Sequence, residues 1–488
     1  MKLYGTAGLW FCLASAGFAA GPKYKPPEVS AAANWQAPAP WHEGSPLDHI
    51  PKGTWWTVFG DAELNQYEDQ AMANNQSLKA GVARLAQARA FARVTAAGLY
   101  PELDAHPAAY RDRLSGNRPL NGSTLTPVAV TQNDFSIPFT LNYELDLFGR
   151  VRRSVEAANA TLQASTADLE NVRLMVSSEL AADYFQLREL DAEIGVIQRA
   201  LGFQQKGLDL VQKRHEGGAV SGLDVAQQQT VLDSSYAQLA LLQQQRAQYE
   251  HAIATLQGIP ASNFKAPVRM LDTQPPAVPL ALPSELLQRR PDIATAERQV
   301  ASANAQIGVA KAAFYPSISL SGSGGFDSAD LVKLIDAPSA VWSIGLSVLE
   351  PLISGGRNHA RLENVRAVYD ENVADYRESS LVAFQQVEDA LSGLNALSAA
   401  FDAQQRAVDD AERSLNLANI RYTGGLVTYL DVITAQEQAL NTERLAAQIL
   451  GQRLVTSVYL VKALGGGWDN SSLAAVGVKP SLKQALQQ

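Results

Sequence analysis

The 488-residue chain has only one cysteine, Cys12, which excludes a disulfide framework and any metal cluster built from cysteines. Its six histidines are scattered without a metal-ligand spacing, and neither a phosphate-loop motif nor G-x-S-x-G is present. Acidic residues outnumber basic ones, 49 to 40, and no basic block is typical of a nucleic-acid binder. We therefore expect no enzyme activity, no cofactor or metal, and no nucleic-acid partner.

Long apolar runs are also missing. Beyond residue 20 no run of eighteen or more apolar residues occurs, so a membrane role would have to use β-strands. Residues 1–20 combine a basic start at Lys2, an apolar stretch and small residues at two candidate cleavage points, which predicts an export signal peptide. An N-terminal anchor helix is the alternative interpretation.

What the chain does contain is an internal repeat. Residues 214–225 read RHEGGAVSGLDV and residues 421–432 read RYTGGLVTYLDV, so equivalent positions lie 207 residues apart. The same offset carries Gly149-Arg150 onto Gly356-Arg357. Several matches in one register indicate a tandem duplication.

The repeat divides the chain into a first unit at 62–258 and a second unit at 284–465. The remaining parts are a signal peptide (1–20), an N-terminal segment (21–61), a linker (259–283) and a C-terminal tail (466–488).

Each unit is expected to begin with a helix. Residues 62–99 and 284–314 are rich in Ala, Gln and Leu with few Gly or Pro, which favours helix. In the second unit Pro291 stands just inside a predicted helix start. Both segments end at a Tyr-Pro pair, Tyr100-Pro101 and Tyr315-Pro316, which match at an offset of 215.

The periodicity then changes to that of strands. Over residues 134–147 every odd position is apolar and every even position except Pro138 is polar, which predicts a strand with two unlike faces. Residues 342–348 repeat this alternation. Weaker alternation before each predicts partner strands, so we expect strand pairs within 101–148 and 316–350, joined by loops at 114–131 and 322–340.

These strands reach the length of about 9–11 residues that a tilted transmembrane strand needs. Aromatic residues such as Phe135, Tyr143 and Trp342 fit the girdles of such a barrel. Four strands cannot close a barrel, so several chains would have to contribute. A soluble sheet with one face on a core is the alternative.

Long helical tracts follow Gly149 and Gly356, over 150–213 and 357–421. An unbroken helix of this length would extend roughly 95 Å. Helices near 222–257 and 429–464 return from the Gly-Gly turns. Their apolar residues recur at steps of three and four, which is typical of coiled coils rather than a compact core.

The chain resembles the outer membrane factor family, the TolC-like exit ducts, and within it the NodT-type efflux proteins. The matching motifs are Gly21-Pro22-Lys23-Tyr24, WWTVFGDAEL from Trp55, YELDLFGR from Tyr143, Arg289-Arg290-Pro291-Asp292-Ile293, Tyr315-Pro316 and both Arg…Gly-Gly…Asp-Val repeats. They extend over essentially the whole mature chain.

This resemblance implies an α+β membrane protein. Three copies with four strands each would form a trimeric 12-stranded transmembrane β-barrel that continues into a long α-helical coiled-coil periplasmic tunnel. It implies a place in the outer membrane of a Gram-negative bacterium, in contact with its lipid. The implied partners are other copies of the chain in a homotrimer, a periplasmic adaptor protein and, through it, an inner-membrane pump of the resistance–nodulation–division (RND) type.

The implied function is a passive exit duct for drugs or other small solutes in a tripartite efflux system. Type I protein secretion is the alternative, because no feature of the chain decides the cargo. A periplasmic coiled-coil scaffold or adaptor would not need the alternating strands.

One departure from the family concerns its lipid anchor. Members of this branch usually carry a lipidated cysteine just before the Gly-Pro-x-Tyr motif, where this chain has Phe18. Cys12 follows Phe11 rather than the small residue that lipoprotein processing requires. We therefore expect no lipid anchor.

The resemblance also implies roles for the turns between the long helices, as adaptor-docking tips. The matching residues are Arg214, Gly217, Gly218, Val220 and Ser221 in the first repeat and Arg421, Gly424, Gly425, Val427 and Thr428 in the second. Glycine would permit left-handed backbone and the close approach of a partner helix. Simple turn chemistry is the alternative interpretation of the glycines.

The resemblance also implies a charged periplasmic aperture near the tips, for which Asp224 and Asp431 are the candidates, and in a trimer each would form a ring of three like charges that attracts cations. Both also fit a capping box, with Ser221 and Thr428 three positions earlier. Where some relatives have a second acid and a locking arginine, this chain has Thr434 and Val427. Gly149, Arg150, Gly356 and Arg357 are expected at the junction between barrel and tunnel.

Overall fold

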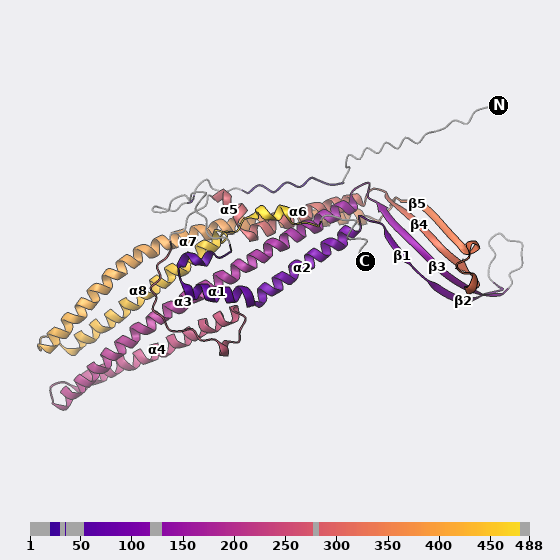
Figure 1. The fold of residues 1–488 in the computed structure, drawn as a ribbon. Helices are drawn as coiled ribbons and strands as arrows, with labels where there is room; N and C mark the ends of the chain where they lie inside the picture. The colour runs from indigo at the N-terminus through magenta and orange to yellow at the C-terminus, as the bar shows by residue number, and fades with distance from the viewer. Residues whose placement is uncertain (1–19, 30–34, 36–52, 118–128, 277–282, 479–488) are drawn as a thin grey trace, which may run out of the picture.

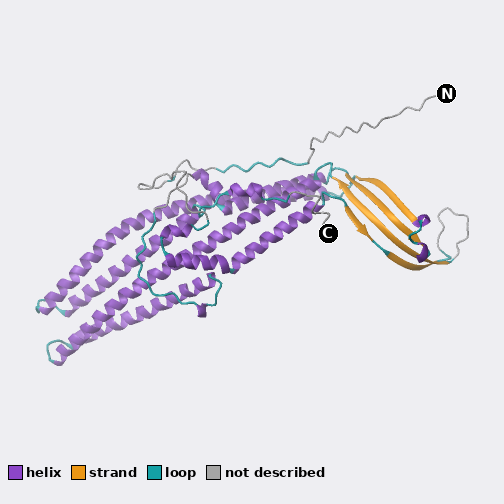
Figure 2. Cartoon of the chain, viewed as in Figure 1, coloured by secondary structure: helices purple, strands orange, loops and turns teal. Residues whose placement is uncertain are grey.

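The computed structural model describes residues 20–29, 35, 53–117, 129–276 and 283–478. The protomer is elongated, with a sheet at one end and long paired helices that extend from it to two separate turns at the other end (Figure 1, Figure 2). Residues 1–19 of the predicted signal peptide, which include Phe18, lie outside the described residues, as do parts of the N-terminal segment, the first strand loop, the linker and the tail. The absence of a lipid anchor therefore stays a prediction.

The sheet is antiparallel, with the strand order β1-β3-β4-β5 and β2 also paired to β3. Its strands are β1 (Glu102–Ala105), β2 (Ala108–Leu114), β3 (Val130–Leu145), β4 (Ser317–Ser328) and β5 (Ala340–Leu349). β1 and β2 lie along the same edge of β3 and are separated only at His106 and Pro107. They therefore occupy a single place in the sheet, and one chain supplies the expected four strand positions.

The register gives the sheet two different faces. Apolar residues stand opposite one another on one face, as in the pairs Tyr143–Leu320 and Leu320–Leu346. On the other face Asn142 pairs with Ser321, and Ser319 pairs with Ser347. The predicted alternation is confirmed, because neighbouring residues of a strand point to opposite sides of the sheet.

The loop that we expected at 322–340 was wrong over its first part, because β4 continues to Ser328 and contains Gly322, Gly324 and Gly325. Gly325 pairs with Pro138 of β3, and a Cβ atom at Gly325 would lie 2.1 Å from the Ile137 carbonyl oxygen. A glycine inside a strand often marks such a close backbone approach. Gly325 therefore allows β4 to lie close against β3.

The expected helices are present, and the structure divides the first helix of each repeat in two. The bounds are α1 (Ala62–Asn74), α2 (Gln76–Ala97), α3 (Arg150–Glu216), α4 (Gly222–Leu256), α5 (Pro283–Arg289), α6 (Pro291–Ala312), α7 (Arg357–Thr423) and α8 (Tyr429–Ala463). Asn75 starts α2, since its side-chain oxygen accepts a hydrogen bond from the Leu78 amide at 3.0 Å. Pro291 occupies the first turn of α6 as predicted.

The helix bounds follow the repeat. α3 and α7 have 67 residues each, and α4 and α8 have 35 each, with starting points 207 residues apart. α2 and α6 have 22 residues each and begin 215 residues apart. Among the described helices, none combines the length and the apolar character that crossing a membrane requires.

The main core lies around the middle of α3. Trp55 and Phe59 of a short 3-10 helix, η1 (Trp55–Phe59), pack there with Tyr184 and Phe185 of α3. A buried ion network lies beside this core, in which Arg188 contacts Glu63 and Asp191, and Arg246 of α4 contacts Asp191 at 2.6 Å. These contacts fix the first helical hairpin to the segments that wrap around it.

Candidate functional site

The two turns that we expected as docking tips have the same backbone. After α3, the amide of Gly217 bonds to the Lys213 carbonyl, and Gly218 has a φ of 72°. After α7, Gly424 bonds to the Ile420 carbonyl, and Gly425 has a φ of 71°. No heavy atom lies within 4 Å of a Cβ built at the second glycine of either turn. These glycines are therefore required by their left-handed backbone, whereas the first glycine of each pair has a negative φ.

The two candidate aperture acids each cap a helix. The carboxylate of Asp224 accepts hydrogen bonds from the Ser221 amide and hydroxyl, both at 3.0 Å. The carboxylate of Asp431 accepts the same bonds from Thr428, at 3.0 and 2.7 Å. Both arrangements form complete capping boxes, as the alternative interpretation of the sequence expected. The hydroxyl of Thr428 lowers the pKa of the exposed Asp431 carboxyl.

A contact between the two hairpins, just above the turns, was not foreseen from the sequence. The guanidinium of Arg214 lies 4.8 Å from the ring centre of Tyr422, and the rings of Tyr422 and Tyr429 lie 5.0 Å apart. The hydroxyl of Tyr429 donates to Gln228 of α4 at 3.0 Å. A Cβ atom at Gly207 of α3 would lie 2.5 Å from that hydroxyl. The second hairpin thus reaches into the first through its tyrosines.

The repeat contains a signal that could have identified this contact. At the offset of 207, Tyr422 corresponds to His215, and Tyr429 corresponds to Gly222. In the first repeat the His215 ring lies 3.7 Å from a Cβ built on Gly222, so the same two positions meet there too. The two repeats share the backbone, and only the second carries the larger aromatic pair. Burial raises the pKa of the Tyr429 hydroxyl to about 12, so it remains a hydrogen-bond donor.

The two junctions between strand and long helix also differ. Gly149 and Gly356 precede α3 and α7 with φ values of 80° and 84°, so both connections from strand to helix need a left-handed residue. At the first junction Arg150 bonds to Glu144 at 2.8 Å, and the Asp146 carboxylate accepts the amide of Arg152 at 2.8 Å. This acid near a helix N-terminus complements the helix dipole.

The second junction lacks this pair of acids, because Pro351 and Ile353 stand at the equivalent positions. Among the described residues, Arg357 forms no ion pair. Asn358 instead donates to the Ala313 carbonyl at 3.0 Å. Tyr315 of the second Tyr-Pro pair reaches the first junction, where its ring stacks on Phe148 with a centroid distance of 4.8 Å.

The predicted site residues therefore lie at two places in the protomer. The tip residues of the two hairpins lie at one end of the protomer, and the junction residues lie beside the sheet (Figure 1). No group of three or more His, Cys, Asp or Glu side chains is placed to hold a metal ion within the described part of the chain.

Comparison with known proteins gives a consistent result. A family model described as "Outer membrane efflux protein" matches residues 68–258 and 282–466. The chain is 34% identical over 420 residues to the pyoverdine export outer membrane protein OpmQ of Pseudomonas aeruginosa, covering 85% of this chain and 88% of that protein. It is 31% identical to the outer membrane protein OprJ of the same species, covering 96% of each. The crystal structure of the Campylobacter jejuni CmeC outer membrane channel superposes with a TM-score of 0.87 at 25% identity, covering 93% of this chain and 96% of that chain.

Proposed function

Since the chain belongs to the outer membrane efflux protein family, we propose that three copies of it enclose one duct and that each copy supplies a third of the barrel and of the tunnel. The observation that carries this proposal is the open sheet. β5 pairs with β4 alone and is exposed along its whole length, and at the opposite edge β1 and β2 pair only with β3. Unpaired backbone groups cost several kcal/mol each in a bilayer, so these edges must meet those of other copies. Four strand positions from each of three chains give twelve.

The tips are the proposed docking surface for a periplasmic adaptor. They lie at the end of the helices farthest from the sheet (Figure 2), and they expose apolar side chains, with Leu223 65% and Leu426 74% exposed. Exposed apolar groups beside a polar rim mark surfaces that bind other proteins. A helical hairpin of an adaptor would fit against them, and the adaptor would connect the duct to an inner-membrane pump of the RND type.

Asp224 and Asp431 retain a proposed second role at the aperture. Capping engages one oxygen of each carboxylate, because both bonds to Ser221 and both bonds to Thr428 reach Oδ2. The other oxygen can still face the passage. In a trimer the two acids would form two rings of negative charge, and these would attract cations and repel anions.

The cargo is proposed to be a small solute. OpmQ is named for pyoverdine export, and further relatives are named for toluene efflux and for cation efflux, at 30% identity. These names favour solute efflux over type I protein secretion. They also differ widely among proteins of one fold, which supports a passive duct whose cargo is selected by the pump.

Fractionation of the native envelope, followed by cross-linking of the outer membrane pool, tests the proposal. We expect a carbonate-resistant species at about three times the 52.4 kDa mass of the chain. A soluble periplasmic monomer would contradict the barrel, the tunnel and the aperture together. Deletion of the gene followed by complementation, with solute efflux measured in intact cells, tests the transport function separately.

A further inference from the structure

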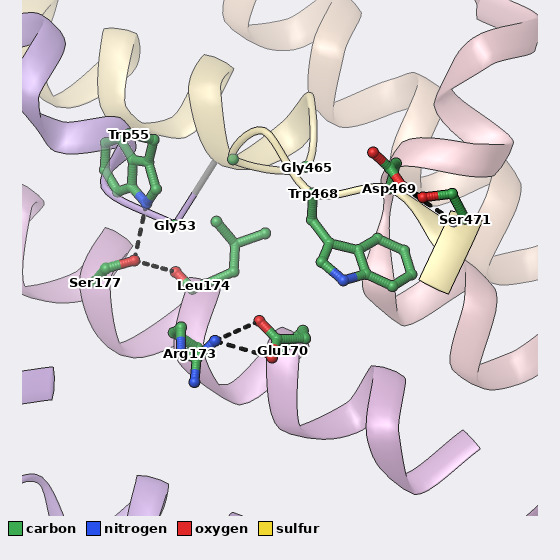
Figure 3. Close-up of a pocket in the computed structure, with 11 residues that line it drawn as sticks. Gly53, Trp55, Glu170, Arg173, Leu174, Ser177, Gly465, Trp468, Asp469 and Ser471 are labelled. Carbon is green, nitrogen blue, oxygen red and sulfur yellow. Dashed lines mark hydrogen bonds and ion pairs between the residues drawn. The ribbon is translucent and has the colours of Figure 1, made fainter. Parts of the chain in front are cut away.

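A cavity of about 370 Å³ lies on the helical part of the protomer, apart from the tips and the junctions. Three segments form it: the approach to η1, the middle of α3, and the chain that follows α8. α3 contributes Glu170, Arg173 and Leu174, and the segment after α8 contributes Trp468. Figure 3 shows the Trp468 indole beside the α3 side chains. None of the functions described above uses this cavity.

The cavity is lined by an aromatic ring, by hydrogen-bond donors and by a carboxylate that accepts hydrogen bonds. Trp468 is half-buried, and Arg173 bonds through one nitrogen, Nη1, to both oxygens of Glu170, at 2.9 and 2.7 Å. In the part of the chain that the structure describes, the Trp468 Nε1–H and the Arg173 Nε–H have no hydrogen-bond partner. A bound molecule would therefore find two free donors, the remaining lone pairs of a carboxylate, and a flat apolar surface.

The rear wall of the cavity is held in place by a buried hydrogen bond. The Trp55 indole donates to the Ser177 hydroxyl at 2.9 Å, and Trp55 is only 2% exposed. Gly466 lies against this wall, since a Cβ atom there would lie 2.5 Å from Leu174 and 3.2 Å from Trp55. The cavity thus has a rigid rear wall and a front formed by Trp468 and the Glu170–Arg173 pair. This arrangement of a largely apolar cleft with a few placed polar groups is typical of a ligand site.

We propose that this cavity binds an N-acetylated amino-sugar unit of the cell-wall glycan, with a pyranose face against Trp468 and a carboxylate or acetamide oxygen on Arg173. A pyranose ring has an apolar C–H face and a rim of hydroxyl groups, which suit the indole and the Glu170 carboxylate. A carboxylate of the wall peptide would bind the free edge of the Arg173 guanidinium, because a guanidinium binds carboxylates in its own plane.

The position of the cavity favours the wall over the other glycan of this envelope. Leu174 lies 24 residues after the start of α3, which places it roughly 36 Å from the barrel junction along the helix. The glycan of the outer leaflet lies beyond the barrel, whereas a tunnel that spans the periplasm must pass through the wall. The inference rests on the proposed duct for this geometry, and the binding test below does not depend on transport.

The experiment is titration of the purified full-length protein in detergent with a soluble disaccharide-tetrapeptide prepared from digested cell wall. Binding is measured by calorimetry and by tryptophan fluorescence. A core oligosaccharide of lipopolysaccharide is titrated in parallel. We expect saturable binding of the wall fragment, about tenfold weaker or worse in Trp468→Ala and in Arg173→Gln. The affinity of Arg173→Lys should lie between those of the wild type and of Arg173→Gln, because lysine keeps the charge and loses the planar edge of the guanidinium.

The chain supplies a matched control in Arg413→Gln, since Arg413 pairs with Asp410 in the same three-residue spacing on an exposed part of α7. It should bind like the wild type. Every variant is first checked for its cross-linked size and its thermal unfolding. The proposal would be overturned if neither sugar bound, if all variants bound the wall fragment equally, or if only the lipopolysaccharide core bound. Efflux in complemented cells, measured separately, tells whether the duct itself has failed.

Discussion

α2 and α6 have the same length and the same place in the two repeats, yet their surroundings differ. Ala86, Ala90 and Ala97 of α2 are exposed, whereas the equivalent alanines of α6, at 301, 305 and 312, are buried. α6 lies between α3 and α7 of its own chain, and α2 packs on α3 alone among the long helices. By the symmetry of the repeat, the neighbour that α2 lacks is an α7. In a ring of copies, the adjacent chain would supply it.

The same reasoning applies to the long helices. Thirty-three residues of α3 are buried, against nine of α7, although both helices have 67 residues. Within one chain α3 packs against several other helices, whereas most of α7 is not buried. The duplication therefore gives two nearly equal halves, and each has a helix that its own chain leaves partly uncovered, α2 in the first repeat and α7 in the second.

The largest effect should come from placing a charge at equivalent positions of α2 and α6. Ala305→Glu would bury a carboxylate where the wild-type side chain is 0% exposed, so we expect a loss of more than about 3 kcal/mol and little folded chain. Ala90→Glu should leave the protomer within about 0.5 kcal/mol of the wild type and abolish the trimer. Membrane yield and cross-linking measure the two effects. Gln306→Glu, at an exposed position of α6, is the control.

A second difference between the repeats is an acid within the α3–α8 interface. Glu189 of α3 is 5% exposed and lies against Gly451, where a Cβ atom would lie 2.4 Å from its carboxylate, and its equivalent in the second repeat is Ala396. Burial, aided by the charge of Glu193, raises the pKa of the Glu189 carboxyl to about 8. The folded state therefore holds a proton that the unfolded state releases above about pH 4.5.

It follows that this carboxyl makes the fold less stable as pH rises from about 4.5 to 8, by up to about 1.4 kcal/mol per pH unit. Glu189→Gln keeps the shape and should remove this slope. Denaturant unfolding between pH 5 and 8.5 measures it. Glu193→Gln is no substitute, because Glu193 is paired with Arg444 at 3.0 Å. An unchanged slope in Glu189→Gln would show that the carboxyl does not titrate in this range.

A smaller effect should appear when the second tip is made to resemble the first. Tyr429→Phe removes the hydrogen bond to Gln228, and Tyr422→His replaces the ring beneath Arg214. Each should weaken the contact between hairpins by about 1 kcal/mol. We expect a higher single-channel conductance in planar bilayers, because the hairpins separate more easily. His215→Ala in the first tip should change conductance less.

The smallest effect should come from the aperture acids. Asp431→Asn preserves an acceptor for the Thr428 amide and removes the charge, so stability should change by less than about 0.5 kcal/mol. If Asp431 lines the passage, the preference for cations should fall, and Asp224→Asn should act in the same direction. Reversal potentials across a salt gradient measure this preference. Unaltered values in both variants would leave capping as the only role.

The sequence predicted the elements whose periodicity is local and strong. The alternation at 134–147, the Gly-Gly turns and the long helices were all placed within a few residues, since each depends on neighbours in the chain. The strand at Gly322–Gly325 was missed because a run of glycines is typical of a loop, and the close approach that Gly325 permits is to Ile137 and Pro138, which lie on another strand. The aromatic contact at the second tip and the cavity beside Trp468 depend on segments far apart in the chain, and only the structure brings them together.

The most direct test of the account compares cysteine labelling at two equivalent alanines. Cys12 is the only cysteine of the chain and lies in the predicted signal peptide, so Ala90→Cys and Ala305→Cys each introduce a unique thiol into the mature protein. Maleimide labelling is measured on the assembled protein and again after its copies are separated in detergent. We predict that Cys at 305 stays protected in both and that Cys at 90 reacts only after separation. Equal labelling at 90 in both states would contradict the shared duct.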